Sequence, residues 1–230
     1  MDIYIIAVIL SIVIGAVHIL GNRLAIRNKE HNLKIISFAA GVSITYIFME
    51  LIPMITEAAI LINRYLFLSA LVGFSIHLFI EKLIYKHKIK HGLIKKMGNE
   101  ENLFYFAHHF ILGIIFVTFL EENLIRGLLF FFIIMVYIFV SNLPTPLERS
   151  ISKEIFLSSS TLLGTLFGIL LVKVLSVSNL IIFALVGIST GILFFTITRH
   201  QIPFYKRGKL RYFALGSIIY AIIIILSWYI

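Results

Sequence analysis

Residues 103–140 read LFYFAHHFILGIIFVTFLEENLIRGLLFFFIIMVYIFV, and they show most clearly the pattern that predicts the fold. Two apolar segments, Leu103–Leu120 and Leu124–Val140, are separated only by the three polar residues 121–123. Each segment is long enough to cross the hydrocarbon core of a bilayer as a helix. Because the link is so short, the two helices must run antiparallel. The stretch therefore predicts a tight transmembrane helical hairpin.

The composition of the whole chain agrees with a membrane protein. Of its 230 residues 60% are hydrophobic and 13% are charged, and the mean hydropathy is +1.03. A soluble domain is about 45–50% apolar and about 25% charged, so a soluble fold is excluded. A membrane β-barrel would alternate in segments of about ten residues, whereas this chain stays apolar over whole spans. Without cysteine there is no disulfide framework and no thiolate metal site.

Apolar segments of spanning length recur along the chain and predict an all-α, polytopic membrane protein with a single transmembrane domain, residues 1–230. We place eight spans at Ile3–Leu20, Ile35–Ile55, Leu66–Tyr85, Leu103–Leu120, Leu124–Val140, Ile155–Val172, Leu180–Ile197 and Tyr212–Ile230. We number them 1 to 8.

The basic residues predict the orientation. Seventeen of the 20 Lys and Arg residues lie in the links after spans 1, 3, 5 and 7, and the alternate links hold only Arg64, Arg126 and Lys173. By the positive-inside rule both termini are extracytoplasmic, and residues 86–102 form a basic cytoplasmic loop. This dispersal over short membrane loops explains the net charge of +9 without nucleic acid. Span 1 lacks a basic leading segment, so we expect it to be a retained helix and not a cleaved signal peptide.

Ionisable residues inside the spans are few and are functional-site hypotheses by default. They are His18, Glu50, His77, His108 and His109, and His200 follows at the cytoplasmic end of span 7. Neutral imidazole is a common ligand of transition metals. For His108 and His109 a ligand role and a structural role remain open. For the lone His18 and His77 an interhelical hydrogen bond is favoured over ligation. For Glu50, which is followed by Pro53, a place on a polar pathway is favoured.

A local pattern is repeated. Span 2 contains Glu50–Pro53, span 7 ends in His200–Pro203 and span 5 ends in Ser141–Pro144, each with a polar residue two or three positions before proline. Spans 2 and 7 also contain small-residue segments, Ser37–Gly41 and Gly187–Gly191. Because spans 2 and 7 run in opposite directions, the pattern indicates inverted repeats of spans 1–3 and 6–8, a common construction in transporters.

Glycines at GxxxG spacing occur twice. Gly164 and Gly168 lie in span 6, and Gly187 and Gly191 lie in span 7. Residues four apart share a helix face, so both pairs predict the close approach of a neighbouring helix.

Span 2 carries a family resemblance. Residues 37–42, SFAAGV, and residues 48–58, FMELIPMITEA, resemble the second helix of ZIP (Zrt/Irt-like) divalent-metal transporters. That family also has eight helices, extracytoplasmic termini and its largest cytoplasmic loop between helices 3 and 4. The resemblance covers most of the chain in topology and is specific in span 2.

The metal motifs of that family are altered here. The segment His108–Gly113 keeps the first histidine and the glycine but has Leu112 in place of a carboxylate. The segment Ser141–Pro146 keeps Asn142 and Pro144 but has Ser141 and Thr145 where the family has strong ligands, and no carboxylate follows Pro203. A carboxylate-bridged binuclear centre is therefore not supported. The resemblance implies a single site at His108, His109 and Asn142, beside Ser141. Glu50 would attract the ion from outside and His200 would release it inside.

The first functional hypothesis is a ZIP-like carrier of zinc, iron or manganese in the cell membrane. The second is a degenerate relative without transport, with a sensing or structural role. A third is a CAAX-type intramembrane protease, because Glu121–Arg126 matches EExxxR, but the two further histidine motifs are missing and we expect no enzyme. The expected partners are the lipid bilayer and a divalent metal ion as substrate, with no cofactor. A homodimer is left open.

Overall fold

The computed structural model describes residues 2–23, 29–90, 99–142, 151–175, 177–202 and 209–230. All regular structure in these ranges is helical. The elements are α1 (Ile3–Arg23), α2 (Lys29–Tyr46), η1 (Ile47–Leu51), α3 (Ile52–Leu61), α4 (Leu66–Lys90), α5 (Asn99–Glu122), α6 (Leu124–Asn142), α7 (Ile151–Ser158), α8 (Ser160–Leu170), η2 (Leu171–Leu175), α9 (Asn179–Thr196), η3 (Ile197–Gln201) and α10 (Leu210–Ser227). The three η elements are π-helical turns.

Eight helical stretches in this described part are long and apolar enough to cross a membrane, which confirms the predicted polytopic all-α fold. Several run beyond the expected limits. Span 2 extends to Lys29 and Leu61, and span 3 to Lys90. Polar residues can continue a helix past the hydrocarbon core because its backbone hydrogen bonds are made internally.

The predicted hairpin is α5–α6, and its turn is closed by Asn123. The Asn123 side-chain oxygen accepts hydrogen bonds from the backbone amides of Ile125 (2.8 Å) and Arg126 (3.1 Å). This N-cap satisfies amides that have no partner within the first turn of α6. The second helix can therefore begin directly after the first one ends.

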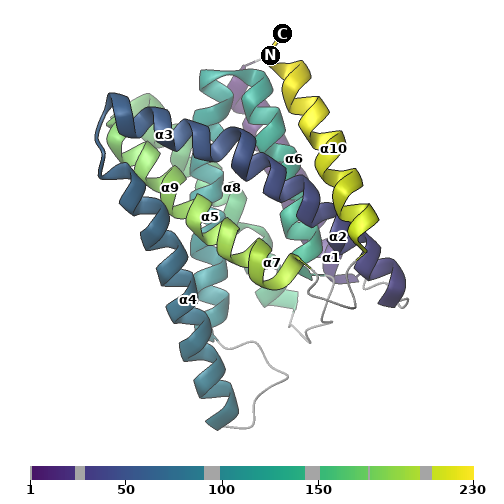
Figure 1. Cartoon of the computed structure of the whole chain (residues 1–230). Helices are drawn as coiled ribbons and strands as arrows, with labels where there is room; N and C mark the ends of the chain where they lie inside the picture. The colour runs from purple at the N-terminus through teal and green to yellow at the C-terminus, as the bar shows by residue number, and fades with distance from the viewer. Residues whose placement is uncertain (1, 24–28, 91–98, 143–150, 176, 203–208) are drawn as a thin grey trace.

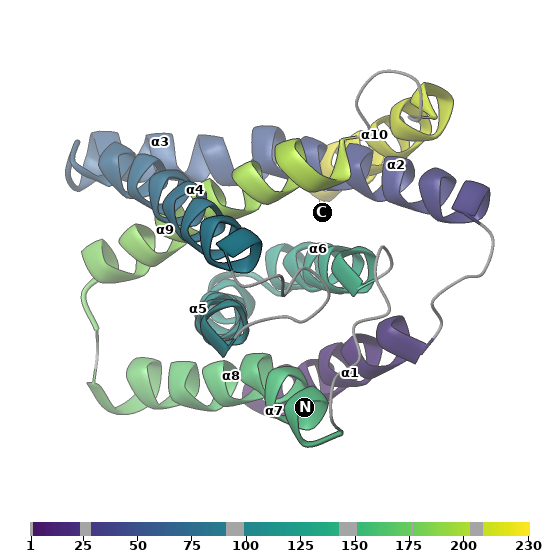
Figure 2. The ribbon, with the colours of Figure 1, turned by 90° about the horizontal axis from the view of Figure 1, so that it is seen from below.

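The helices form three layers (Figure 2). The α5–α6 hairpin lies in the middle, with α1, α7 and α8 on one side and α2, α3, α4, α9 and α10 on the other. The most extensive packing is between α4 and α9, α5 and α8, and α2 and α10. Both chain ends lie at one end of the bundle (Figure 1), which we call the terminal end. We call the opposite end, where α1 ends at Arg23 and α4 at Lys90, the basic end.

Close packing at the predicted glycines is confirmed. A Cβ on Gly191 would lie 2.0 Å from the Ala70 carbonyl oxygen of α4, and one on Gly164 would lie 2.0 Å from the Phe110 carbonyl oxygen of α5. Gly168 leaves more room, with its nearest neighbouring atom 3.1 Å away. Only glycine allows the backbones at Gly191 and Gly164 to approach this closely.

The two halves of the chain correspond in detail. Gly41 precedes the π-helical turn Ile47–Leu51 by six residues, and Gly191 precedes Ile197–Gln201 by the same number. Gly41 approaches α10 as Gly191 approaches α4. This agreement favours the inverted repeat of spans 1–3 and 6–8, which stays an interpretation, as does the extracytoplasmic location of the termini.

Candidate functional site

His108 and His109 lie in the central helix α5, nine and ten residues from its start at Asn99. At 1.5 Å per residue this is roughly 14 Å into the bundle from the basic end. Their side chains are 3% and 1% exposed, so both imidazoles are inside the protein and away from lipid.

The pair has a geometry that suits one shared ion. The ring centroids are 5.6 Å apart. Two imidazoles that bind one zinc ion tetrahedrally, with Zn–N near 2.0–2.1 Å, have centroids roughly 5 Å apart. The separation of the two rings is therefore close to that of a pair sharing one ion.

Hydrogen bonding determines which nitrogens are suitable ligands. His109 Nδ1 lies 2.8 Å from the Tyr105 carbonyl oxygen, so Nδ1–H donates and the lone pair is on Nε2. A backbone carbonyl in this role is typical of metal-binding histidines. His108 Nε2 is buried and has no hydrogen-bond partner among the described residues. Such a nitrogen is costly to bury unless a water or an ion contacts it.

Two tyrosines enclose the pair. Tyr137 of α6 lies with its ring centroid 5.8 Å from that of His108 and 5.8 Å from that of His109. Tyr105 of α5 is 3.9 Å from His109 by the same measure. Sequence reasoning missed both because tyrosine counts as an ordinary apolar residue of a span. Tyr105 lies four residues before His109 on the same helix face, so the sequence could have indicated it. Tyr137 belongs to α6, and its place beside the pair could not be predicted.

The other two intramembrane histidines join the same region. The His18 ring of α1 lies 5.7 Å from the Tyr105 ring. His77 of α4 shares a hydrogen bond of 3.1 Å with the Thr196 hydroxyl of α9, and its ring lies 4.9 Å from that of Phe104, four residues before His108 on α5. The interhelical hydrogen bond expected for a lone histidine is therefore observed at His77. The histidines and tyrosines of this cluster come from four helices, α1, α4, α5 and α6.

Three further predicted ligands are Ser141, Asn142 and His200. The Ser141 hydroxyl donates to the Tyr137 carbonyl oxygen at 2.7 Å, within its own helix. Asn142 and His200 belong to described helices, but their side chains lie outside what the structure describes. Within the described residues no three His, Cys, Asp or Glu side chains are close enough together to hold a metal ion.

Glu50 lies apart from the histidines. It is in the π-helical turn Ile47–Leu51, and its Oε1 accepts a hydrogen bond of 3.2 Å from Trp228 Nε1. Trp228 directly follows α10 at the terminal end. Pro53, which has no amide hydrogen, stands in the first turn of α3, and the π-helical turn adjusts the helix just before it. Polar pathways in membrane proteins often contain such breaks.

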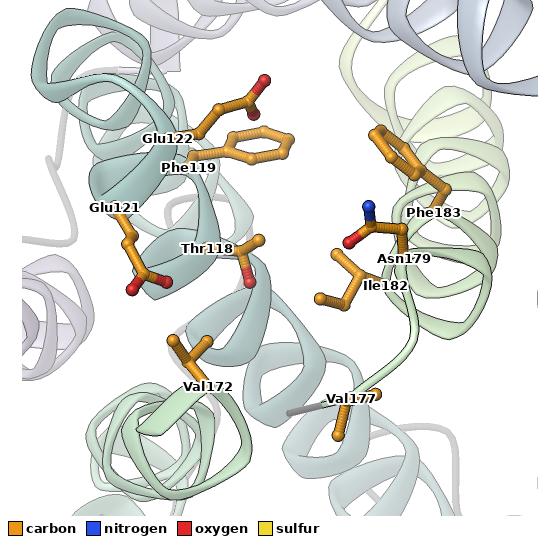
Figure 3. Close-up of a pocket in the computed structure, with 9 residues that line it drawn as sticks. All are labelled: Thr118, Phe119, Glu121, Glu122, Val172, Val177, Asn179, Ile182 and Phe183. Atoms are coloured by element: carbon orange, nitrogen blue, oxygen red, sulfur yellow. The ribbon is translucent and has the colours of Figure 1, made fainter. Parts of the chain in front are cut away.

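A cavity of about 390 Å³ opens near the terminal end of α5 (Figure 3). Its lining comes from α5, η2, α9 and the link before α9: Thr118, Phe119, Glu121, Glu122, Val172, Val177, Asn179, Ile182 and Phe183. The Glu121 carboxylate accepts a hydrogen bond of 2.9 Å from the Tyr4 hydroxyl, and Glu122 forms an ion pair with Arg126. The EExxxR residues thus contact Tyr4 and each other at the end of the bundle opposite to the buried histidines.

No protein-family model matches the chain, and no curated protein matches it significantly. The fold defines a multi-pass helical membrane protein.

Proposed function

We propose that this protein is a ZIP-like carrier of a divalent metal cation, such as zinc, iron or manganese, across the cell membrane. His108 and His109 bind the ion, and Asn142 and Ser141 at the end of α6 complete the site. The observation that carries the proposal is the buried imidazole pair in the central hairpin. His109 is oriented by the Tyr105 carbonyl, and the pair lies in the middle layer of the bundle.

Charge outside the site supports movement of a cation. The cavity at the terminal end carries Glu121, and Glu50 adds a second carboxylate in the same half, while Glu122 is paired with Arg126. These groups lower the potential for a cation that enters from that end. Neutral ligands stabilise a dication less than carboxylates do, so the proposed site is a weak one, which suits release. His200 is proposed to receive the ion at the basic end.

The test is uptake of zinc, iron, manganese and cadmium into proteoliposomes. We expect time-dependent uptake of at least one ion, reduced to the level of empty vesicles in His108→Ala. Leu103→Ala on the same helix is the matched control, because Leu103 is 64% exposed towards lipid and should transport normally. Absence of uptake of all four ions by the folded wild-type protein would overturn the proposal.

A second candidate is a ZIP-like membrane protein that does not transport metal. It is favoured by the absence, in the described ranges, of a group of three strong ligands. The two candidates differ in ligand-linked stability. An ion that binds the native state at 100 times its Kd stabilises it by about 2.7 kcal/mol, whereas a degenerate site gives no shift of the unfolding temperature with metal.

A further inference from the structure

A column of polar side chains follows one face of α5 from the basic end. Asn102, Tyr105 and His109 are spaced by three and then four residues, so they lie on one side of the helix. Asn102 is 8% exposed, and its Oδ1 has no hydrogen-bond partner in the described part of the chain. A buried amide oxygen of this kind indicates contact with water or with a polar ligand.

Helix α1 contributes to the same column. Its buried stripe consists of Ala7, Ser11, Ile14 and His18, and the last of these is 2% exposed beside Tyr105. His18 lies five residues before the end of α1 at Arg23, roughly 8 Å from the basic end, which is a depth similar to that of Tyr105. Two different helices therefore direct polar groups into one strip of the interior.

The column ends at His109. Further along the same face of α5 stand Leu112, Phe116 and Leu120, which are 0%, 0% and 1% exposed. Their side chains offer no hydrogen bond to water or to an ion, and they belong to the main hydrophobic core. Polar side chains thus follow this face from the basic end to His109 and stop there.

We infer that Asn102, Tyr105 and His18 line a hydrated access path between the basic end and the His108–His109 pair, closed on the far side by Leu112, Phe116 and Leu120. The hydration of the path follows from these residues alone. Its use for releasing a divalent cation rests on the proposed function.

The chain contains no cysteine, so single cysteines can test the path in the otherwise unaltered protein. Asn102→Cys and Tyr105→Cys are compared with Leu112→Cys and Phe116→Cys, their matched controls on the same helix face. A membrane-impermeant, positively charged thiol reagent is applied to vesicles whose basic end faces the reagent. Size-exclusion profiles identify the variants that fold, and either path variant is sufficient.

We expect the path cysteines to react at least tenfold faster than the controls. Equal rates in a folded path variant and a folded control would overturn the inference. Labelling requires no metal, so the two proposals can fail separately. Fast labelling without ion uptake contradicts only the proposed function, whereas uptake without fast labelling contradicts only the path.

Discussion

His108 should lower the stability of the metal-free protein, and His108→Leu tests this. The substitution keeps a similar side-chain volume but removes the buried Nε2 that has no partner within the described residues. Removing an unsatisfied buried polar atom recovers about 1–3 kcal/mol, and losing the ring contact with Tyr137 costs about 0.5–1.5 kcal/mol. The expected net gain is about 1 kcal/mol. In a chain of this size that raises Tm by about 2–4 °C.

The assay is thermal unfolding in detergent without metal, followed by helical circular dichroism. His77→Leu is the matched control because the His77 imidazole hydrogen-bonds the Thr196 hydroxyl, and its loss should destabilise the protein by about 1 kcal/mol. If His108 is kept for function at the expense of stability, His108→Leu raises Tm and His77→Leu lowers it. If His108→Leu were as destabilising as His77→Leu, His108 would be a structural residue and the reasoning would be refuted.

Two further predictions concern other parts of the bundle. Glu50→Gln should abolish ion uptake while leaving Tm unchanged, because the amide oxygen can still accept from Trp228; normal uptake in this variant would leave Glu50 only a structural role. Gly191→Ala should destabilise the protein by about 1–3 kcal/mol, because the new methyl group meets the Ala70 carbonyl oxygen. Gly168→Ala should destabilise it clearly less, since its nearest neighbouring atom is 3.1 Å away. Denaturant unfolding measures both, and the reverse order would contradict the prediction.

Much of the fold could be predicted from the sequence because a membrane span has a strong one-dimensional signal. The eight spans and the hairpin turn at Asn123 followed from apolar length and from one short polar link. The π-helical turn before Pro53 was not predicted, because it depends on how the backbone compensates for proline. The layer order was not predicted either. It depends on lateral contacts between helices, to which hydropathy is insensitive.

Of the candidate site, only the His108–His109 pair could be predicted from the sequence. The place of His108 and His109 within span 4 could be predicted from the sequence, whereas their burial against neighbouring helices depends on packing. That His18 packs on Tyr105 and His77 on Phe104, close to the pair on α5, could not be predicted, because these residues come from helices distant in sequence. Tyr137 also reaches the pair from another helix. Each enters the cluster through tertiary packing.

The central claim is that His108 and His109 together bind a divalent metal ion. X-ray absorption spectroscopy of the purified protein loaded with zinc tests it most directly, since imidazole ligands give a characteristic multiple-scattering pattern. We predict zinc bound with two histidines in wild-type protein and one in His109→Ala. Zinc that does not bind, or a spectrum unchanged by His109→Ala and by His108→Ala, would contradict the claim.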